Sequence, residues 1–321
     1  MHFAVPERDR IFRRYSVWIL FYSVFVILWG AFVRASLSGD GCGDHWPLCD
    51  GELLPSSPSF QKAVEFLHRT TSGLAWIACG VGFLGARLWF KTDDVRRTSS
   101  GWVLFFMTTE ALIGAGLVLL EMVAQNQVQG RAWWMAAHLS NTFLLLGAMC
   151  WQTWSSFYPA ATSRGFFDTA VQRWIALACA SLVAISITGA LAALGDTLYL
   201  GTDFGTHLSL QTYRTAPPLI QARLLHPLTA LLGAAIIVTA LGYTVGAETS
   251  VQAHRIAIGC LVCVILQLGI GATNVALLAP AWLQIVHLFF ADLLWIGLIF
   301  LALERATAHR TALWVREPSR A

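Results

Sequence analysis

Charged residues are scarce in this chain, and their scarcity excludes an ordinary soluble domain. Of the 321 residues, 12% are Asp, Glu, Lys or Arg and 56% are hydrophobic, whereas about 25% of residues are charged in a typical soluble domain. The formal net charge of only +3 indicates no nucleic-acid partner. The sequence also lacks a Rossmann fingerprint and a P-loop lysine motif, which would have indicated a nicotinamide or ATP partner. The composition instead predicts a polytopic protein embedded in a lipid bilayer.

Eight apolar stretches are long enough to cross a bilayer, which needs roughly 20 residues per helix. They lie at about 15–38, 63–90, 99–121, 132–157, 171–194, 219–245, 254–278 and 281–303. The first stretch follows four arginines and so also resembles the start of a secretion signal. We interpret it as a retained helix, because no small-residue cleavage site precedes Arg34. The expected fold is all-α with eight transmembrane helices.

The distribution of basic residues predicts the orientation in the membrane. Most of them fall in connections that share one side if both termini face the cytoplasm. They are Arg8, Arg10, Arg13, Arg14, Lys91, Arg96, Arg97, Arg164, Arg255, Arg305, Arg310, Arg316 and Arg320. The opposite connections hold or border Lys62, Arg131 and Arg214. We therefore expect an N-in, C-in topology.

The second half of the chain repeats the first. The corresponding residues are His68 and His226, Glu110 and Gln267, Gly30-Ala31 and Gly189-Ala190, and His138 and His287. The first three pairs are 157 to 159 residues apart, and the last pair is closer because the final connection is short. The repeat predicts two tandem, pseudo-symmetric four-helix units, residues 1–165 and 166–321. They would be related by an axis along the membrane normal.

Four histidines, His68, His138, His226 and His287, lie a few residues inside even-numbered apolar stretches. Ionisable side chains are costly in a bilayer, so four at similar depth indicate a site. Two imidazoles that face each other across a bundle suit the two axial positions of a heme iron. Alternatively, each histidine merely bonds a neighbouring helix. Zinc is less favoured because neither half offers a third and fourth ligand.

The two halves differ beside these histidines. Glu65 precedes His68 by three residues and shares its helical face, whereas Arg223 stands at the equivalent place in the second half. A carboxylate beside a heme can take up protons or place water, and a guanidinium suits a heme propionate. The alternative for Glu65 is an interfacial ion pair with Arg69 or Lys62.

The connection between the first two stretches contains Cys42 and Cys49, separated by six residues rich in turn formers. Outside the cytoplasm such a pair can oxidise and persist, so we predict a disulfide. Its expected role is to pin the loop over the bundle or to tune redox chemistry, with thiol exchange as the alternative. The pattern assigns no role to His45 in this loop or to Glu110 in the third stretch.

Taken together, these motifs resemble the heme A synthase family, in the bacterial form with a cysteine pair in an outer loop. The segments that carry the resemblance are Gly30-Ala31-Phe32-Val33-Arg34, Asp44-His45-Trp46-Pro47-Leu48-Cys49, Glu65-x-x-His68-Arg69, His138-Leu139, Thr188-Gly189-Ala190, Gly195-Asp196, His226 and His287-Leu288. They span nearly the whole chain, and the Trp-Pro-Leu-Cys loop with the Glu-x-x-His helix is the most specific part. One departure is that the outer loop of the second half, about 195–218, has no cysteine.

The resemblance implies oxidation of a methyl group of heme O to the formyl group of heme A, through hydroxylated intermediates, for cytochrome oxidase maturation. It implies that His68 and His138 ligate the substrate heme, with Glu65 assisting catalysis. The second half would hold a heme b cofactor through His226 and His287, beside Arg223.

Further implications concern partners and location. The family would receive heme O from a heme O synthase and needs an acceptor for four electrons. The expected location is a bacterial cell membrane, with the heme sites toward the outer face, and a homo-oligomer is compatible with this. Two rival functions are a diheme, cytochrome b-type quinol electron-transfer protein and a non-catalytic heme-delivery protein. The Glu65 and Arg223 difference and the cysteine loop favour the synthase.

Overall fold

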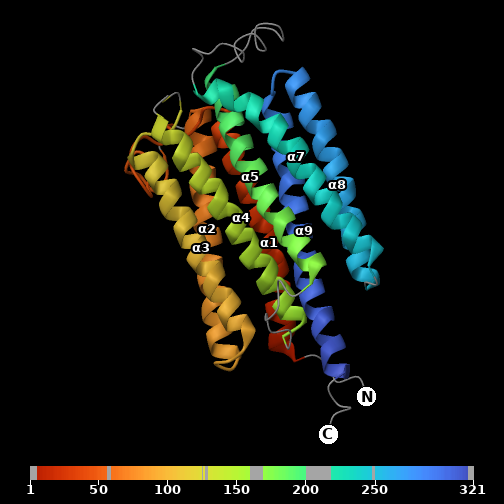
Figure 1. The fold of residues 1–321 in the computed structure, drawn as a ribbon. Coiled ribbons are helices and arrows are strands. Elements are labelled where there is room, and N and C mark those ends of the chain that lie inside the picture. The colour runs from red at the N-terminus through yellow and green to blue at the C-terminus, as the bar shows by residue number, and fades with distance from the viewer. Residues whose placement is uncertain are drawn as a thin grey trace.

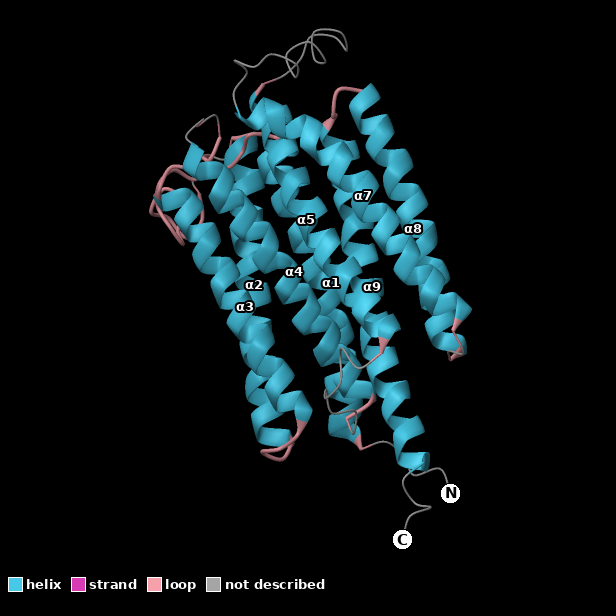
Figure 2. Cartoon of the chain, in the orientation of Figure 1, coloured by secondary structure: helices cyan, strands magenta, loops and turns pink. Residues whose placement is uncertain are grey.

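All eight long elements in the described part of the chain are helices. The computed structural model describes residues 6–55, 59–124, 126, 129–159, 169–199, 218–247 and 250–316 (Figures 1 and 2). The helices are α1 (Glu7–Ala35), α2 (Phe60–Trp89), α3 (Val95–Leu119), α4 (Gln129–Phe157), α5 (Ala170–Leu198), α7 (Pro218–Gly246), α8 (Val251–Ala276) and α9 (Ala281–Arg316). The expected all-α fold with eight helices is confirmed.

Several helices begin at a side chain that satisfies the first free backbone N–H groups. Ser59, Asp94, Thr169 and Ser250 are the N-cap residues of α2, α3, α5 and α8, and each accepts a hydrogen bond from a backbone N–H in the first turn. Such N-caps typically contribute about 1 kcal/mol each. They place the helix starts at the polar edges of the apolar stretches.

The outermost helix ends extend past the apolar stretches. The helix α1 begins at Glu7 instead of about residue 15, and α9 continues to Arg316 instead of about residue 303. The α1 extension contains four Arg, and the α9 extension contains three Arg and three Ala; both residue types have high helix propensity. Hydropathy marks where lipid ends, and a helix can continue beyond that point into the interfacial region.

Seven of the eight described helices are apolar and long enough to cross a membrane, and α4 is the exception. At 29 residues α4 is long enough, but it carries polar side chains that are buried in protein. Among them are Asn141, Thr142, Gln152 and Thr153. The helix packs against α1, α3, α5 and α9, so its polar groups avoid lipid. The chain is a multi-pass membrane protein.

The helices form an inner group and two flanks. The inner helices α1, α4, α5 and α9 contact one another, while α2 and α3 lie on one flank and α7 and α8 on the other (Figure 1). One continuous apolar core joins both halves and includes Ile19, Leu146, Ile175 and Leu298. The flanking helices expose large apolar side chains, among them Leu74, Ile77, Val81, Leu84, Leu228, Leu231, Leu232, Ile258, Val262 and Ile265. Such faces suit contact with lipid tails.

Arg34, at the end of α1, ties the two halves together. Its guanidinium donates to the Ala193 carbonyl and to the Thr197 hydroxyl of α5, and to Gln284 Oε1 of α9, each at 2.9 Å. A single first-half side chain therefore bonds two second-half helices. Charge-assisted hydrogen bonds of this kind are stronger than neutral ones, so Arg34 fixes the register of the halves at this end of the bundle.

The start of α1 and the end of α9 lie at the same end of the bundle, as an even number of helices requires (Figure 1). The loop with the cysteine pair lies at the opposite end (Figure 1). Which end faces the cytoplasm remains a prediction from the basic residues. Of these, Arg164, Arg214 and Arg320 lie outside the described residues.

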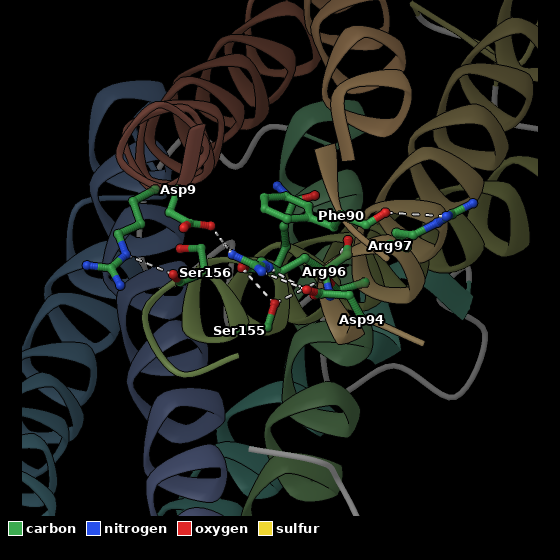
Figure 3. A network of polar contacts seen from close by, with 10 residues as sticks. Asp9, Phe90, Asp94, Arg96, Arg97, Ser155 and Ser156 are labelled. Atoms are coloured by element: carbon green, nitrogen blue, oxygen red, sulfur yellow. Dashed lines mark hydrogen bonds and ion pairs between the residues drawn. The ribbon is translucent and has the colours of Figure 1, made fainter. Parts of the chain in front are cut away.

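A network around Arg96 closes the end where α1 begins (Figure 3). Arg96 Nη1 lies 2.5 Å from Asp9 Oδ1 of α1, and Nη2 lies 2.6 Å from Asp94 Oδ2. Its guanidinium carbon also lies 3.5 Å from the centre of the Phe90 ring. Burial opposes ionisation of Asp94, but the hydrogen bonds from Arg96 outweigh it and lower the pKa of that carboxyl. The network joins α1 to the α2–α3 connection.

We predict that Arg96→Met destabilises the protein by roughly 3 kcal/mol, because it leaves two carboxylates without their shared partner. Thermal unfolding of the purified protein in detergent measures this. The control is Arg87→Met, an exposed arginine on α2, which should change stability by less than about 0.5 kcal/mol. Because the folded pKa of Asp94 is lowered, its contribution should be complete at neutral pH. It should fade only as the pH falls below about 4. Equal melting of both variants would contradict the prediction.

Candidate functional site

Each of the four membrane histidines lies against a glycine of the preceding helix. His68 of α2 faces Gly30 of α1, and His226 of α7 faces Gly189 of α5. A Cβ at either glycine would stand 2.9 Å from the imidazole Cε1, closer than non-bonded carbon atoms approach. Glycine is therefore required for these two imidazoles to lie against the neighbouring backbone.

The same arrangement recurs, with more space, at the other two histidines. A Cβ at Gly271 of α8 would lie 3.3 Å from His287 Cε1, and one at Gly114 of α3 would lie 3.8 Å from His138 Nε2. The structure is thus built from four helical hairpins. In each of them the first helix supplies a glycine and the second supplies a histidine.

The structure brings the histidines together in pairs within each half. The ring centroids of His226 and His287 are 6.3 Å apart. Metal–imidazole bonds are about 2 Å long, so one iron between two opposed imidazoles would separate their centroids by roughly 6 Å. In the first half, His68 of α2 and His138 of α4 lie on helices that both pack against α3. The His226–His287 pair has the spacing that two axial ligands of one heme would need.

A heme takes at most two axial ligands from the protein, whereas a bare metal ion is usually held by three or more side chains. Within residues 6–316 as far as they are described, no group of three or more His, Cys, Asp and Glu side chains could hold a bare metal ion. Two side-chain nitrogens, His68 Nδ1 and His287 Nδ1, are buried with no hydrogen-bond partner in that same part of the chain. Buried unsatisfied polar groups are costly and are typical of functional sites.

Glu110 contacts His138. Its Oε1 lies 2.7 Å from His138 Nδ1, and its Oε2 accepts a 2.6 Å hydrogen bond from Asn141 Nδ2. The Thr142 hydroxyl donates to Oε1 as well. The intramembrane carboxylate of α3 is thus held by three side chains of α4, one of which is a predicted heme ligand.

Glu65 is buried and engaged on both oxygens. Its Oε1 accepts hydrogen bonds from Arg69 Nε at 3.1 Å and Nη2 at 2.7 Å, and its Oε2 accepts one from the Cys42 backbone N–H at 2.8 Å. Only 3% of Glu65 is exposed. Of the two ion-pair partners considered from the sequence, Arg69 is the one that it contacts, because Lys62 instead pairs with Asp50 at 2.5 Å.

The cysteine loop is anchored on this ion pair. The predicted disulfide between Cys42 and Cys49 is present. Arg69 donates to the carbonyl oxygens of His45 and Leu48, so the loop backbone is fastened to α2. The His45 side chain is exposed and lies beside Asp44. The loop and the Glu65 carboxylate are therefore joined through Arg69 and the Cys42 N–H.

The loop also approaches α2 very closely at Gly41. A Cβ there would lie 2.5 Å from the Gln61 carbonyl carbon, which no side chain tolerates. Gly41 directly precedes Cys42, so this contact brings the Cys42 N–H to Glu65. This close contact with α2 is a second interaction that holds the loop against that helix.

In the second half, Arg223 is buried and bonded to α5. Its Nε lies 2.8 Å from Asp196 Oδ1, and Nη2 donates to the Gly195 and Tyr199 carbonyls at 2.7 and 2.6 Å. The equivalent positions of the two halves, Glu65 and Arg223, thus carry side chains of opposite charge type, and each has an ion-pair partner. Glu65 and Arg69 both lie on α2, whereas Arg223 of α7 pairs with Asp196 of α5.

Sequence reasoning missed the contacts that orient these groups. The repeat of Gly30 and Gly189 in the sequence does not by itself indicate that His68 and His226 lie against these glycines. The Glu110 to His138 contact was also missed. Its only signal was an acidic residue and a histidine on consecutive apolar stretches, which does not specify that the two side chains point toward each other.

We predict that Arg69→Met loosens the cysteine loop, since it removes the donors to two loop carbonyls and to Glu65. In wild-type protein, thiol labelling of Cys42 and Cys49 should require a reductant. In the variant, the rate of reduction by dithiothreitol should rise several-fold. Arg87→Met, at the far end of the same helix, is the matched control. Labelling of the wild type without reductant, or unchanged reduction in Arg69→Met, would contradict this picture.

Comparison with known proteins bears on the whole chain. A protein named protoheme IX farnesyltransferase from Thermus thermophilus is 39% identical over 293 residues, which is 90% of this chain but 47% of that protein. The chain thus spans about half the length of this relative. Proteins named heme A synthase match shorter regions: 38% identity over 98 residues in Halalkalibacterium halodurans and 41% over 98 residues in Bacillus cereus. These two matches cover 30% of this chain and 32% and 31% of the relatives.

A family model matches most of the chain as well. The model is that of the COX15-CtaA cytochrome oxidase assembly proteins, and it matches residues 13–299. That range includes most of α1 and of α9 and all of α2, α3, α4, α5, α7 and α8, and with them all four histidines, Glu65 and the cysteine loop. The resemblance inferred from the motifs is confirmed at this level, and the chain belongs to the COX15-CtaA family of cytochrome oxidase assembly proteins.

Proposed function

We propose that this protein is a heme A synthase, which oxidises a methyl group of heme O to the formyl group of heme A through hydroxylated intermediates. In net terms, the methyl group and one water give the formyl group, four protons and four electrons. The electrons leave to a redox-active acceptor outside the chain. The observation that carries the proposal is a repeated pair of histidines in which Glu65 and Glu110 accompany the first pair, whereas Arg223 and Gln267 stand at the equivalent places in the second half.

The first half is assigned to the substrate because its polar groups suit proton removal. Glu65 lies one turn from His68 on the same face of α2, and its carboxylate is fixed by Arg69 and Cys42. A fixed carboxylate can accept a proton from a substrate methyl or hydroxymethyl group, or hold a water molecule. The cysteine loop contacts this carboxylate directly, through the Cys42 N–H.

The second half is assigned to a cofactor because it lacks the equivalent carboxylate. A heme b held by His226 and His287 would supply a one-electron relay from the substrate site toward the acceptor. Arg223, fixed by Asp196 and α5 carbonyls, places a positive charge on the helix of His226, where a guanidinium would favour a heme propionate. The inner helices that separate the two sites are packed directly together, which suits electron transfer between halves.

The partners follow from the same reaction. One relative is named for farnesyl transfer to protoheme IX, and this chain matches 47% of it. We propose that a heme O synthase delivers the substrate to this protein. The histidine-bearing helix ends and the cysteine loop would face the outer side of the membrane.

The cofactor assignment predicts the effect of removing single ligands. His226→Ala or His287→Ala should abolish the low-spin heme b spectrum, while the amount of protein in the membrane stays within about twofold of wild type. Ligation is lost, whereas the apolar faces that insert the helices are kept. The measurement is the absorbance spectrum of the purified protein. The control is His254→Ala, because His254 lies at the start of α8, whereas Gly271, which contacts His287, lies near the end of that helix. Unchanged low-spin spectra in both variants would refute the assignment.

The catalytic assignment predicts what Glu65→Gln accumulates. The amide keeps the shape of the carboxylate and can still accept from the Cys42 N–H, but it cannot take up a proton. Heme extracted after co-expression with a heme O source should be heme O or a hydroxylated intermediate, with heme A reduced about 100-fold or more. Glu65→Asp should retain some turnover, because the carboxylate survives with poorer reach.

Arg69→Lys separates catalysis from loop anchoring. Lysine keeps a positive charge beside Glu65 but loses the planar, multiple donation to the loop. If Glu65 serves only to anchor the loop, Arg69→Lys and Glu65→Gln should give the same heme profile. If it is catalytic, Arg69→Lys should retain far more heme A. Unchanged heme b alone in every extract would favour an electron-transfer or delivery protein.

A further inference from the structure

The four histidines differ in what their second ring nitrogen meets. His138 Nδ1 lies 2.7 Å from the Glu110 carboxylate, and His226 Nδ1 lies 3.3 Å from the Thr188 hydroxyl. His68 Nδ1 and His287 Nδ1 meet no hydrogen-bond partner within the described part of the chain. One of the four predicted ligands therefore stands apart, because its second ring nitrogen contacts a carboxyl group.

The Glu110 carboxylate is held in a built site. Asn141 donates to its Oε2 through Nδ2, and that amide is itself fixed by Thr109, whose hydroxyl lies 2.7 Å from Asn141 Oδ1. The Asn141 Nδ2 group also donates to the Phe106 carbonyl at 2.9 Å. The Thr142 hydroxyl donates to Oε1. The carboxylate has little freedom, so its orientation toward His138 is set by α3 and α4 together.

The second half offers an amide at the equivalent place. Gly114, one turn after Glu110, lies against His138, and Gly271, one turn after Gln267, lies against His287. The two hairpins are therefore equivalent in geometry as well as in sequence. Gln267 Oε1 is buried and without a partner among the described residues, and His287 Nδ1 receives no carboxylate. At this position the first half therefore has a carboxyl group and the second half a carboxamide.

We propose that Glu110 is a positioning residue that makes the iron bound by His138 the more electron-rich of the two irons. This inference rests on the proposed function, in which His138 ligates the substrate heme. A histidine that donates Nδ1–H to a carboxylate keeps Nε2 free for the metal and becomes a more basic ligand. A more basic axial ligand stabilises the ferric state and so lowers the reduction potential. The difference favours electron flow from the first site to the second.

The test compares Glu110→Gln with the reciprocal Gln267→Glu in full-length protein purified in detergent. Glu110→Gln is combined with His226→Ala and His287→Ala, so that hemin binds at the first site alone. Gln267→Glu is combined with His68→Ala and His138→Ala, so that it binds at the second site alone. Hemin titration gives the affinity, and a potentiometric titration of the heme absorbance gives the midpoint potential.

Glu110→Gln should weaken hemin binding about 10- to 100-fold and shift the midpoint potential upward, with part of both effects reversed in Glu110→Asp. Gln267→Glu should shift the potential of the second site downward. A merely structural role would lower yield or melting temperature but leave the potential of the surviving protein unchanged. An unchanged or lowered potential in Glu110→Gln overturns the inference.

The reciprocal variant keeps the inference falsifiable if Glu110→Gln does not fold, because failure of Gln267→Glu to lower the potential would then overturn it. If the proposed function itself is wrong, the titration gives a different result. The first-site protein with Glu110 intact would then bind no hemin, and adding His68→Ala would not change its hemin binding. That result would reject the ligand assignment itself, whereas a bound heme with an insensitive potential rejects only the role of Glu110.

Discussion

The close approach of each imidazole to a glycine of the preceding helix is the constraint on which the rest of the structure depends. At Gly30 and Gly189 a Cβ would stand 2.9 Å from the imidazole Cε1, so each ring can occupy this place only when no side chain stands there. Small residues permit such close contact between membrane helices. The contact fixes the rotation of each helix, and the rotation aims the histidine at its partner within the half.

A pseudo-symmetric frame then carries unsymmetric charge. Both halves repeat the glycine–histidine hairpins. Where the first half has Glu65 and Glu110, however, the second half has Arg223 and Gln267. Two otherwise similar sites therefore differ in their electrostatic surroundings and in their capacity to accept protons. We attribute the proposed division into a substrate site and a cofactor site to these two substitutions, since the helical framework around them is shared.

The cysteine loop belongs to the site and does more than cover it. Glu65 accepts from the Cys42 N–H, and Arg69 joins that carboxylate to the loop carbonyls. The disulfide loop, the ion pair and the histidine-bearing helix are thus joined through one carboxylate.

The sequence by itself determined the features that depend on local composition. Eight helices, the tandem repeat, the four histidines and the Cys42–Cys49 disulfide follow from apolar length, spacing and turn-forming residues, because each of these is a property of a short segment. Only the tertiary structure decided which groups meet. In it Glu65 pairs with Arg69 and not with Lys62, and Glu110 contacts His138. The polar helix α4 packs among other helices, and Arg34 joins the two halves. The physical reason is that such contacts depend on the rotation and depth of neighbouring helices. Those are set by close packing over the whole bundle, which no single stretch of sequence contains.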